Sequence, residues 1–140
     1  PDYAQKAKTI SELAIDLSQL IAKEIEGQNI RIDKPKRVAF HSPCTLQHGL
    51  GLKGIVEGIL TNAGYHLCQV KDPHLCCGSA GTYSILQPKL SKQLRINKQT
   101  ALTIDTPDII ATANIGCQLQ IANGAKVPVV HWIELLNDAL

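Results

Sequence analysis

The sequence of 140 residues has no methionine, and aromatic residues make up only 4% of it. Its 14 basic and 12 acidic residues leave a formal charge of +2, so the charge does not favour nucleic acid or another polyanion as a partner. No apolar run approaches the roughly 18 residues of a membrane span, and the polar first residues are unlike a signal peptide. With 10 glycines and 7 prolines the chain is also not of low complexity. One ordinary globular domain is therefore expected.

Five cysteines are an odd number for a chain that needs no covalent cross-links. A domain of this size buries roughly 68–70% of its unfolded surface and folds without disulfides or metal. The cysteines therefore fit a reducing compartment and indicate metal or redox chemistry.

Short apolar runs and segments of helical spacing alternate along the chain. The predicted strands are Val38–Phe40, Tyr65–Val70, Ile109–Ala113 and Val127–Val130. The predicted helices run over residues 52–63, 88–104, 118–122 and 132–140, with Gly64 ending the first and Pro88 beginning the second. Four alternations predict an α/β fold of three layers, a parallel four-stranded sheet with helices on both faces, Rossmann-like in arrangement.

A leading helix from Asp2 to about Glu26 is predicted, because its apolar residues fall on one face. Asp2 and Gln5 could form its capping box, and Gly27 is a natural end. This face is expected to pack on the sheet, with contact to a partner as the alternative. Residues 28–37 read as a polar, solvated connector.

Four cysteines follow three of the predicted strands. Cys44 comes after the first, Cys76 and Cys77 after the second, and Cys117 after the third. Loops that leave the carboxyl ends of parallel strands meet at one edge of the sheet, so these thiols are expected to lie together. Cys68 falls inside a strand and is expected to be a small buried apolar residue.

A disulfide explains this set poorly. Neighbouring Cα atoms such as those of Cys76 and Cys77 lie about 3.8 Å apart, below the usual disulfide range that begins near 4.4 Å. Thiolates are the preferred ligands of iron–sulfur clusters and of zinc. Gly78, Gly81 and Gly116 beside these cysteines could let the backbone curl around such a centre, although tight turns explain them as well.

Three histidines also belong to this region. His74 precedes the cysteine pair, His131 ends the fourth strand, and His41 begins the loop that leads to Cys44. Each could be a ligand, a proton relay or a hydrogen-bond donor to a thiolate, or could serve packing alone. Lys71, a protonated His74 and backbone N–H groups are the expected counter-charges of a negative centre.

The spacing of these cysteines resembles the cysteine-rich CCG domain. There are 31 residues between Cys44 and Cys76, and 39 residues between Cys77 and Cys117. That domain occurs in heterodisulfide reductases and in the iron–sulfur subunits of several flavin-linked dehydrogenases. The strings LCCGSAGTYSILQP, ATANIGCQ and HWIELL are most similar to the second CCG domain of subunits of the glycolate oxidase type. The chain would then be a single CCG domain, residues 1–140, from the C-terminal part of a longer subunit.

The resemblance implies that Cys44, Cys76, Cys77 and Cys117 bind a [4Fe–4S] cluster, with zinc as the alternative. The family's pattern ends in a further cysteine where this sequence has Gln120, which disfavours a five-thiolate cluster. The implied function is electron transfer in a 2-hydroxy-acid (glycolate-type) oxidoreductase, from a flavoprotein subunit toward the quinone pool, in the cytoplasm or at the inner face of the membrane through partners. The alternatives are a structural zinc module for subunit assembly and a thiol–disulfide redox domain.

Overall fold

Four parallel strands form the centre of the fold. The computed structural model describes residues 2–139, and within them the strands are β1 (Arg37–His41), β2 (His66–Leu67), β3 (Ile109–Thr112) and β4 (Val129–His131). Their order in the sheet is β2-β1-β3-β4, and every neighbouring pair is parallel. The predicted α/β class is confirmed.

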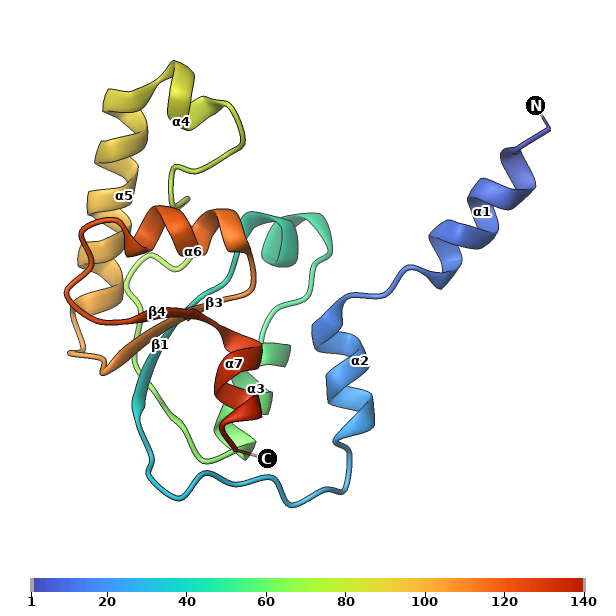
Figure 1. Cartoon of the computed structure of the whole chain (residues 1–140), viewed down its shortest axis with the longest axis horizontal. Coiled ribbons are helices and arrows are strands. Elements are labelled where there is room, and N and C mark those ends of the chain that lie inside the picture. The colour runs from blue at the N-terminus through green and yellow to red at the C-terminus, as the bar shows by residue number, and fades with distance from the viewer. Residues whose placement is uncertain (1, 140) are drawn as a thin grey trace.

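Helices cover both faces of this sheet (Figure 1). One face packs on α3 (Ile55–Asn62) and α7 (Trp132–Asn137), through Val38 and Phe40 of β1. The other face packs on α5 (Pro88–Thr103) and α6 (Ile115–Ala122), where Ala39 and Ile110 meet Leu102 and Ile121. Successive strand residues point to opposite faces, which is why β1 contributes to both layers.

Several predicted boundaries are right and others are wrong. Pro88 does begin α5, and Gly64, with a φ of 97°, follows the end of α3. The strand predicted over Tyr65–Val70 has only two residues, because after Cys68 the chain turns away and the backbone of Gln69 bonds to Asp105. A π-helix, η1 (Thr45–Gly49), and the short α4 (Tyr83–Leu86) were not predicted. Of the predicted last helix, Leu140 lies outside the described residues.

The single leading helix predicted from Asp2 to Glu26 is wrong. The structure has α1 (Ala4–Leu13) and α2 (Leu17–Glu24), separated by an extended Ala14. The capping box belongs to Asp16 and Gln19 at the start of α2, whereas α1 has no side-chain cap. A capped helix start in the middle of a periodic pattern ends the preceding helix.

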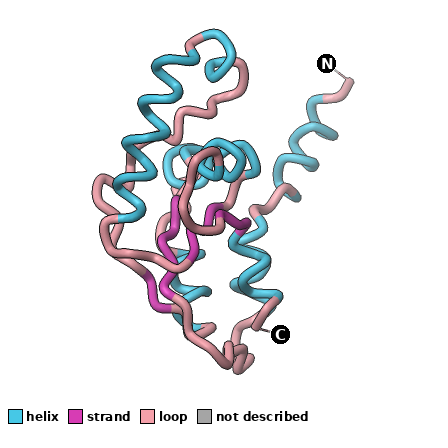
Figure 2. Tube along the Cα trace, turned by 60° about the vertical axis from the view of Figure 1, so that its left-hand side comes forward, coloured by secondary structure: helices cyan, strands magenta, loops and turns pink. Residues whose placement is uncertain are grey.

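The two leading helices have different environments. Ile21 and Ala22 of α2, with Ile25 at its C-cap, pack against the core cluster around α3, as the amphipathic pattern predicts. No residue of α1 is buried, and its Ile10 and Leu13 are 69% and 75% exposed. Figure 2 shows α1 projecting away from the sheet and its covering helices. The predicted packing therefore holds only in part, because the second half of the predicted helix packs on the core through α3 and the first half does not pack on it.

Replacing Asp16 by alanine tests the observed helix boundary. The Asp16 carboxylate accepts a 2.8 Å hydrogen bond from the Ser18 backbone N–H, and its loss is expected to lower the free energy of unfolding by about 1 kcal/mol. Urea denaturation measures the change, and Asp2→Ala, which removes no helix cap, is the matched control expected to have little effect. Equal losses in the two variants would contradict the observed capping.

Candidate metal centre

The site lies where the strand order reverses. The chain passes from β1 to β2 on one side and later returns to place β3 on the other side of β1. In open parallel sheets such a reversal leaves a crevice outside the carboxyl ends of the two strands, where ligands bind. His41 ends β1 directly beside Thr112 at the end of β3, and the Thr112 hydroxyl donates a 2.9 Å hydrogen bond to the His41 carbonyl oxygen.

Three buried metal-binding side chains meet at this crevice. One ligand atom each from His41, Cys77 and Cys117 lies within 4.8 Å of the others. The sulfur atoms of Cys77 and Cys117 are 3.2 Å apart and share a hydrogen bond. These residues come from the end of β1, the loop after β2 and the start of α6, so only the fold brings them together.

Cys117 is positioned by the first turn of α6. Asn114 is the N-cap of this helix, and its side-chain oxygen accepts a 3.2 Å hydrogen bond from the Cys117 backbone N–H. The sequence pattern predicts a start only at Gln118, but an asparagine before an apolar run is the capping signal that places the start earlier.

Cys76 and Cys77 are positioned by the turn that follows them. Gly78 has a φ of 86°, and a Cβ atom on it would lie 2.6 Å from the Ser91 carbonyl oxygen of α5. The Ser91 hydroxyl donates a 2.8 Å hydrogen bond to the Gly78 carbonyl oxygen and accepts one of 2.8 Å from the side-chain amide of Gln120. Gln120 stands where the resemblance leads us to expect a further cysteine. Its side chain is bonded to Ser91, and Ser91 in turn is bonded to the cysteine loop at Gly78.

Cys44 and Cys76 lie next to the buried group. Cys44 is exposed just before η1, and Cys76 is half-buried, with its sulfur accepting a 3.3 Å hydrogen bond from the Gly78 N–H. Burial raises the pKa of the Cys44 thiol, and the neighbouring Cys76 raises it further. The negative charges of Cys44 and Cys76, when these are ionised, also raise the pKa of Cys117. The four thiols are therefore electrostatically coupled.

The pKa values of the buried pair move in opposite directions. The hydrogen bond from Cys117 lowers the pKa of Cys77, with a smaller contribution from His41. The same hydrogen bond raises the pKa of Cys117, which keeps its proton while Cys77 gives one up. Burial lowers the pKa of His41 and keeps the imidazole neutral, the form that binds metals. One ready thiolate and one neutral imidazole therefore face the crevice.

His41 gives a test of whether the site fits a metal. Both of its ring nitrogens are buried, and within residues 2–139 neither has a hydrogen-bond partner. A buried imidazole without partners costs free energy unless something else satisfies it. Thiolates with an unsatisfied imidazole are the donor set of zinc and iron centres, so the residues fit a metal centre.

The other predicted site residues lie in different surroundings. His74 is exposed, as is Lys71. His131 is the N-cap of α7; its ring nitrogen accepts a 3.4 Å hydrogen bond from the Ile133 N–H, while its backbone N–H donates to Glu134. Gly81 is exposed with open space around it, and Gly116 allows Ser79 to approach, since a Cβ there would lie 3.1 Å from the Ser79 hydroxyl.

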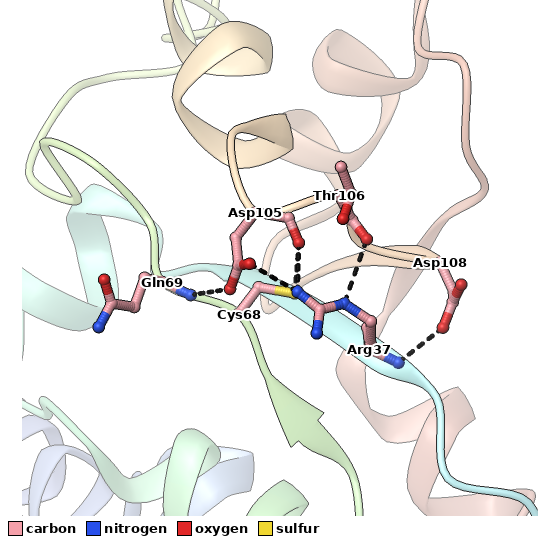
Figure 3. A network of polar contacts seen from close by, with 6 residues as sticks. All are labelled: Arg37, Cys68, Gln69, Asp105, Thr106 and Asp108. Carbon is pink, nitrogen blue, oxygen red and sulfur yellow. Dashed lines mark hydrogen bonds and ion pairs between the residues drawn. The ribbon is translucent and has the colours of Figure 1, made fainter.

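Cys68 belongs to another part of the molecule. It lies next to a polar network at the start of β1, in which Arg37 bonds to the Asp105 carboxylate and to the carbonyl oxygens of Asp105 and Thr106 (Figure 3). The Cys68 sulfur is 3.5 Å from the Asp105 carbonyl oxygen, and burial raises the pKa of its thiol. Cys68 packs in part against the cluster around Ala39 and Leu102, but it is half-buried and follows the end of β2, so the predicted buried position inside a strand is wrong.

Two residues that support the site are not among those predicted from the sequence. Ser91 and Lys98 of α5 are buried on the helix face that carries Leu94, Ala101 and Leu102, and Lys98 is 0% exposed. Their spacing from these apolar residues is the i, i+3, i+4, i+7 pattern of an inward face, which is the signal that could have found them.

No helix in residues 2–139 combines the length and apolar character needed to cross a bilayer.

Together, the parallel sheet and the thiols at its switch point define a cysteine-rich α/β domain with a candidate metal centre. The profile of the CCG family, a cysteine-rich domain, matches residues 38–122, and the chain belongs to this family. The predicted membership is confirmed.

Related proteins extend this match along the chain. The glycolate oxidase iron-sulfur subunit of Escherichia coli is 51% identical over 139 residues, which are 99% of this chain and 34% of that protein. Lactate utilization protein A of Geobacillus thermodenitrificans is 25% identical, over 98% of this chain and 60% of that protein. Lactate utilization protein A of Bacillus cytotoxicus is 26% identical, over 99% of this chain and 60% of that protein. The chain thus spans about a third of the first relative and about three fifths of the others.

Replacing Gly78 by alanine tests the close approach of α5 to the cysteine loop. The new Cβ would overlap the Ser91 carbonyl oxygen and require an unfavourable φ, so the free energy of unfolding is expected to fall by about 2–3 kcal/mol. Gly81→Ala is the matched control, with a φ of 56° in the same loop but no atom within 4 Å of the new Cβ. Urea denaturation of both variants should give the larger loss for Gly78→Ala; a larger loss for Gly81→Ala would contradict the packing described.

Proposed function

We propose that the chain is an iron–sulfur electron-transfer domain of a flavin-linked 2-hydroxy-acid oxidoreductase of the glycolate type. It would receive electrons from a flavoprotein subunit and pass them toward a quinone acceptor, in the cytoplasm or at the inner membrane face through its partners. The observation that carries the proposal is the buried Cys77–Cys117 pair, 3.2 Å apart beside His41 at the sheet's switch point. The names of the E. coli and Geobacillus relatives, an iron-sulfur subunit and a lactate utilization protein, support it.

The proposed ligands are Cys44, Cys76, Cys77 and Cys117, holding a [4Fe–4S] cluster that supplies one-electron transfer. Cys77 is the thiol most ready to bind, because its pKa is lowered by the hydrogen bond from Cys117. His41 is an additional neutral donor at the buried side. Gly78 lets the cysteine loop lie close to α5, Gly116 lets Ser79 lie close to α6, and His74 and His131 are the candidates for tuning the centre.

The burial of the ligands is suited to electron transfer. Cys77 and Cys117 are 2% and 8% exposed, so most of the centre would be shielded from water and from oxygen. Cys44 is exposed, and on this side the centre would reach the surface. A centre that is mostly buried but open at one ligand can exchange electrons with a docked partner without exposing its iron to solvent.

A structural zinc site is the second candidate. His41, Cys77 and Cys117 are a three-ligand group within 4.8 Å, and imidazole with thiolates is a common zinc donor set. The site would then fix the loops for contact with another subunit and carry no electrons.

Metal analysis of the chain purified without oxygen separates these functions. An electron-transfer domain should contain iron and inorganic sulfide and absorb near roughly 400 nm, with the band bleached by dithionite. One zinc ion per chain without sulfide would overturn the proposal in favour of the structural site. If the protein stays metal-free after anaerobic reconstitution, the electron-transfer proposal is overturned and the thiol–disulfide function remains. That function is tested by measuring whether the chain reduces a disulfide substrate.

Serine substitutions test the ligand set. Cys77→Ser and Cys117→Ser are expected to lower iron retention by about tenfold or more, because each removes a thiolate from the buried pair. Cys68→Ser is the matched control, since its thiol contacts the Asp105 carbonyl oxygen, outside the group of His41, Cys77 and Cys117. Iron and sulfide per folded chain are the measurement, and equal retention in the Cys77 and Cys68 variants would refute the assignment.

A further inference from the structure

A lysine without exposed surface lies beneath the cysteine loop. Lys98 is on the inward face of α5, and its side chain is 0% exposed. Its ammonium group donates a 2.9 Å hydrogen bond to the Pro73 carbonyl oxygen, three residues before Cys76. An ammonium group has three donors, and burying its charge costs several kcal/mol unless a negative group compensates.

Within the described part of the chain, no carboxylate pairs with this charge. Among residues 2–139 the ion pairs are Lys8–Glu12 and Arg37–Asp105, and Lys98 belongs to neither. The groups whose negative charge acts on Lys98 are Cys44, Cys77, Cys117 and Cys76. Burial is the larger effect and lowers the pKa of Lys98, while each of the four thiols, when it is ionised, raises it. The chain has therefore buried a cation that is bonded to the cysteine loop and whose charge acts on the four thiols.

We propose that Lys98 is the counter-charge of the thiolate centre, a positioning residue that stabilises its negative charge and thereby sets how readily it accepts an electron. This inference rests on the proposed iron–sulfur function. Four thiolates around a metal centre give it a net negative charge, and each electron taken up adds another. A fixed cation nearby favours the more negative, reduced state, so Lys98 raises the reduction potential. The exposed Lys71 and His74, expected to do this from the sequence, are solvated and hence weaker.

The Pro73 hydrogen bond gives Lys98 a second, structural contact, which the experiment must separate from the charge. Lys98→Gln keeps an N–H donor, one bond closer to the backbone than the lysine ammonium group, and removes the charge. Lys98→Met removes both. Lys92→Gln is the matched control, because Lys92 lies on the same helix and is exposed.

The test is an anaerobic redox titration of the reconstituted full chain, with iron content and urea denaturation of each variant. Lys98→Gln is expected to reduce the equilibrium constant for reduction about tenfold relative to Lys92→Gln, which is a fall of about 59 mV in the midpoint potential of a one-electron couple. Lys98→Met should show the same fall. A structural role alone would change the stability and leave the potential unchanged.

Three results would overturn the proposal. The first is a folded, iron-loaded Lys98→Gln or Lys98→Met variant with the potential of the control. The second is a higher potential in either variant. The third is loss of folding in both, which would make a structural contribution of the lysine side chain the main role of Lys98.

A chain that takes up no iron would refute the proposed function. The counter-charge role of Lys98 would then be tested by the affinity of the chain for zinc. A zinc ion held by four thiolates carries two net negative charges, so Lys98→Gln is expected to bind zinc about tenfold more weakly than Lys92→Gln. Competition with a chromophoric chelator measures this ratio, and equal affinities would overturn the counter-charge role.

Discussion

The parallel pairing of β1 with β3 is the interaction on which the site depends. It places His41 beside Thr112 at one edge of the sheet and makes the loops after both strands leave from that edge. Cys44 follows one strand, and Cys117 follows the other within the first turn of α6. Without this pairing the thiols would remain spread over a segment of 74 residues, from Cys44 to Cys117. The candidate metal centre is thus a consequence of sheet topology.

Helix α5 holds the remaining part of the site in place. Its residue Ser91 bonds to the Gly78 carbonyl oxygen and approaches so closely that only glycine fits there. Two turns further along the same helical face, Lys98 bonds to Pro73 at the other end of the same loop. The cysteine pair is therefore held on both sides by one rigid element, and rigid support keeps metal ligands in a fixed geometry. The same helix brings a buried positive charge to the thiols.

The sequence predicts the sheet well because its signals are local and strong. The apolar runs at Val38 and Ile109 and the proline that begins α5 are each recognisable without knowledge of the fold. The prediction of one leading helix is wrong because an apolar period continues across Asp16, where a local cap interrupts the backbone. The second predicted strand is too long because the turn after Cys68 depends on the distant Asp105. Periodicity detects a face, but does not detect a tertiary contact that ends an element.

The sequence by itself determined the class of fold, the cysteines that gather at one edge and the family to which the chain belongs. These follow from the order of strands, helices and loops, since parallel strands have only one carboxyl edge. Only the tertiary structure decided that His41 joins Cys77 and Cys117 in the interior, and that Cys68 lies in a different network. It also decided that the buried cation is Lys98 and not Lys71, which is nearer to the cysteine pair in the sequence. Burial and the distances between remote side chains depend on how layers pack, and no local pattern encodes that packing.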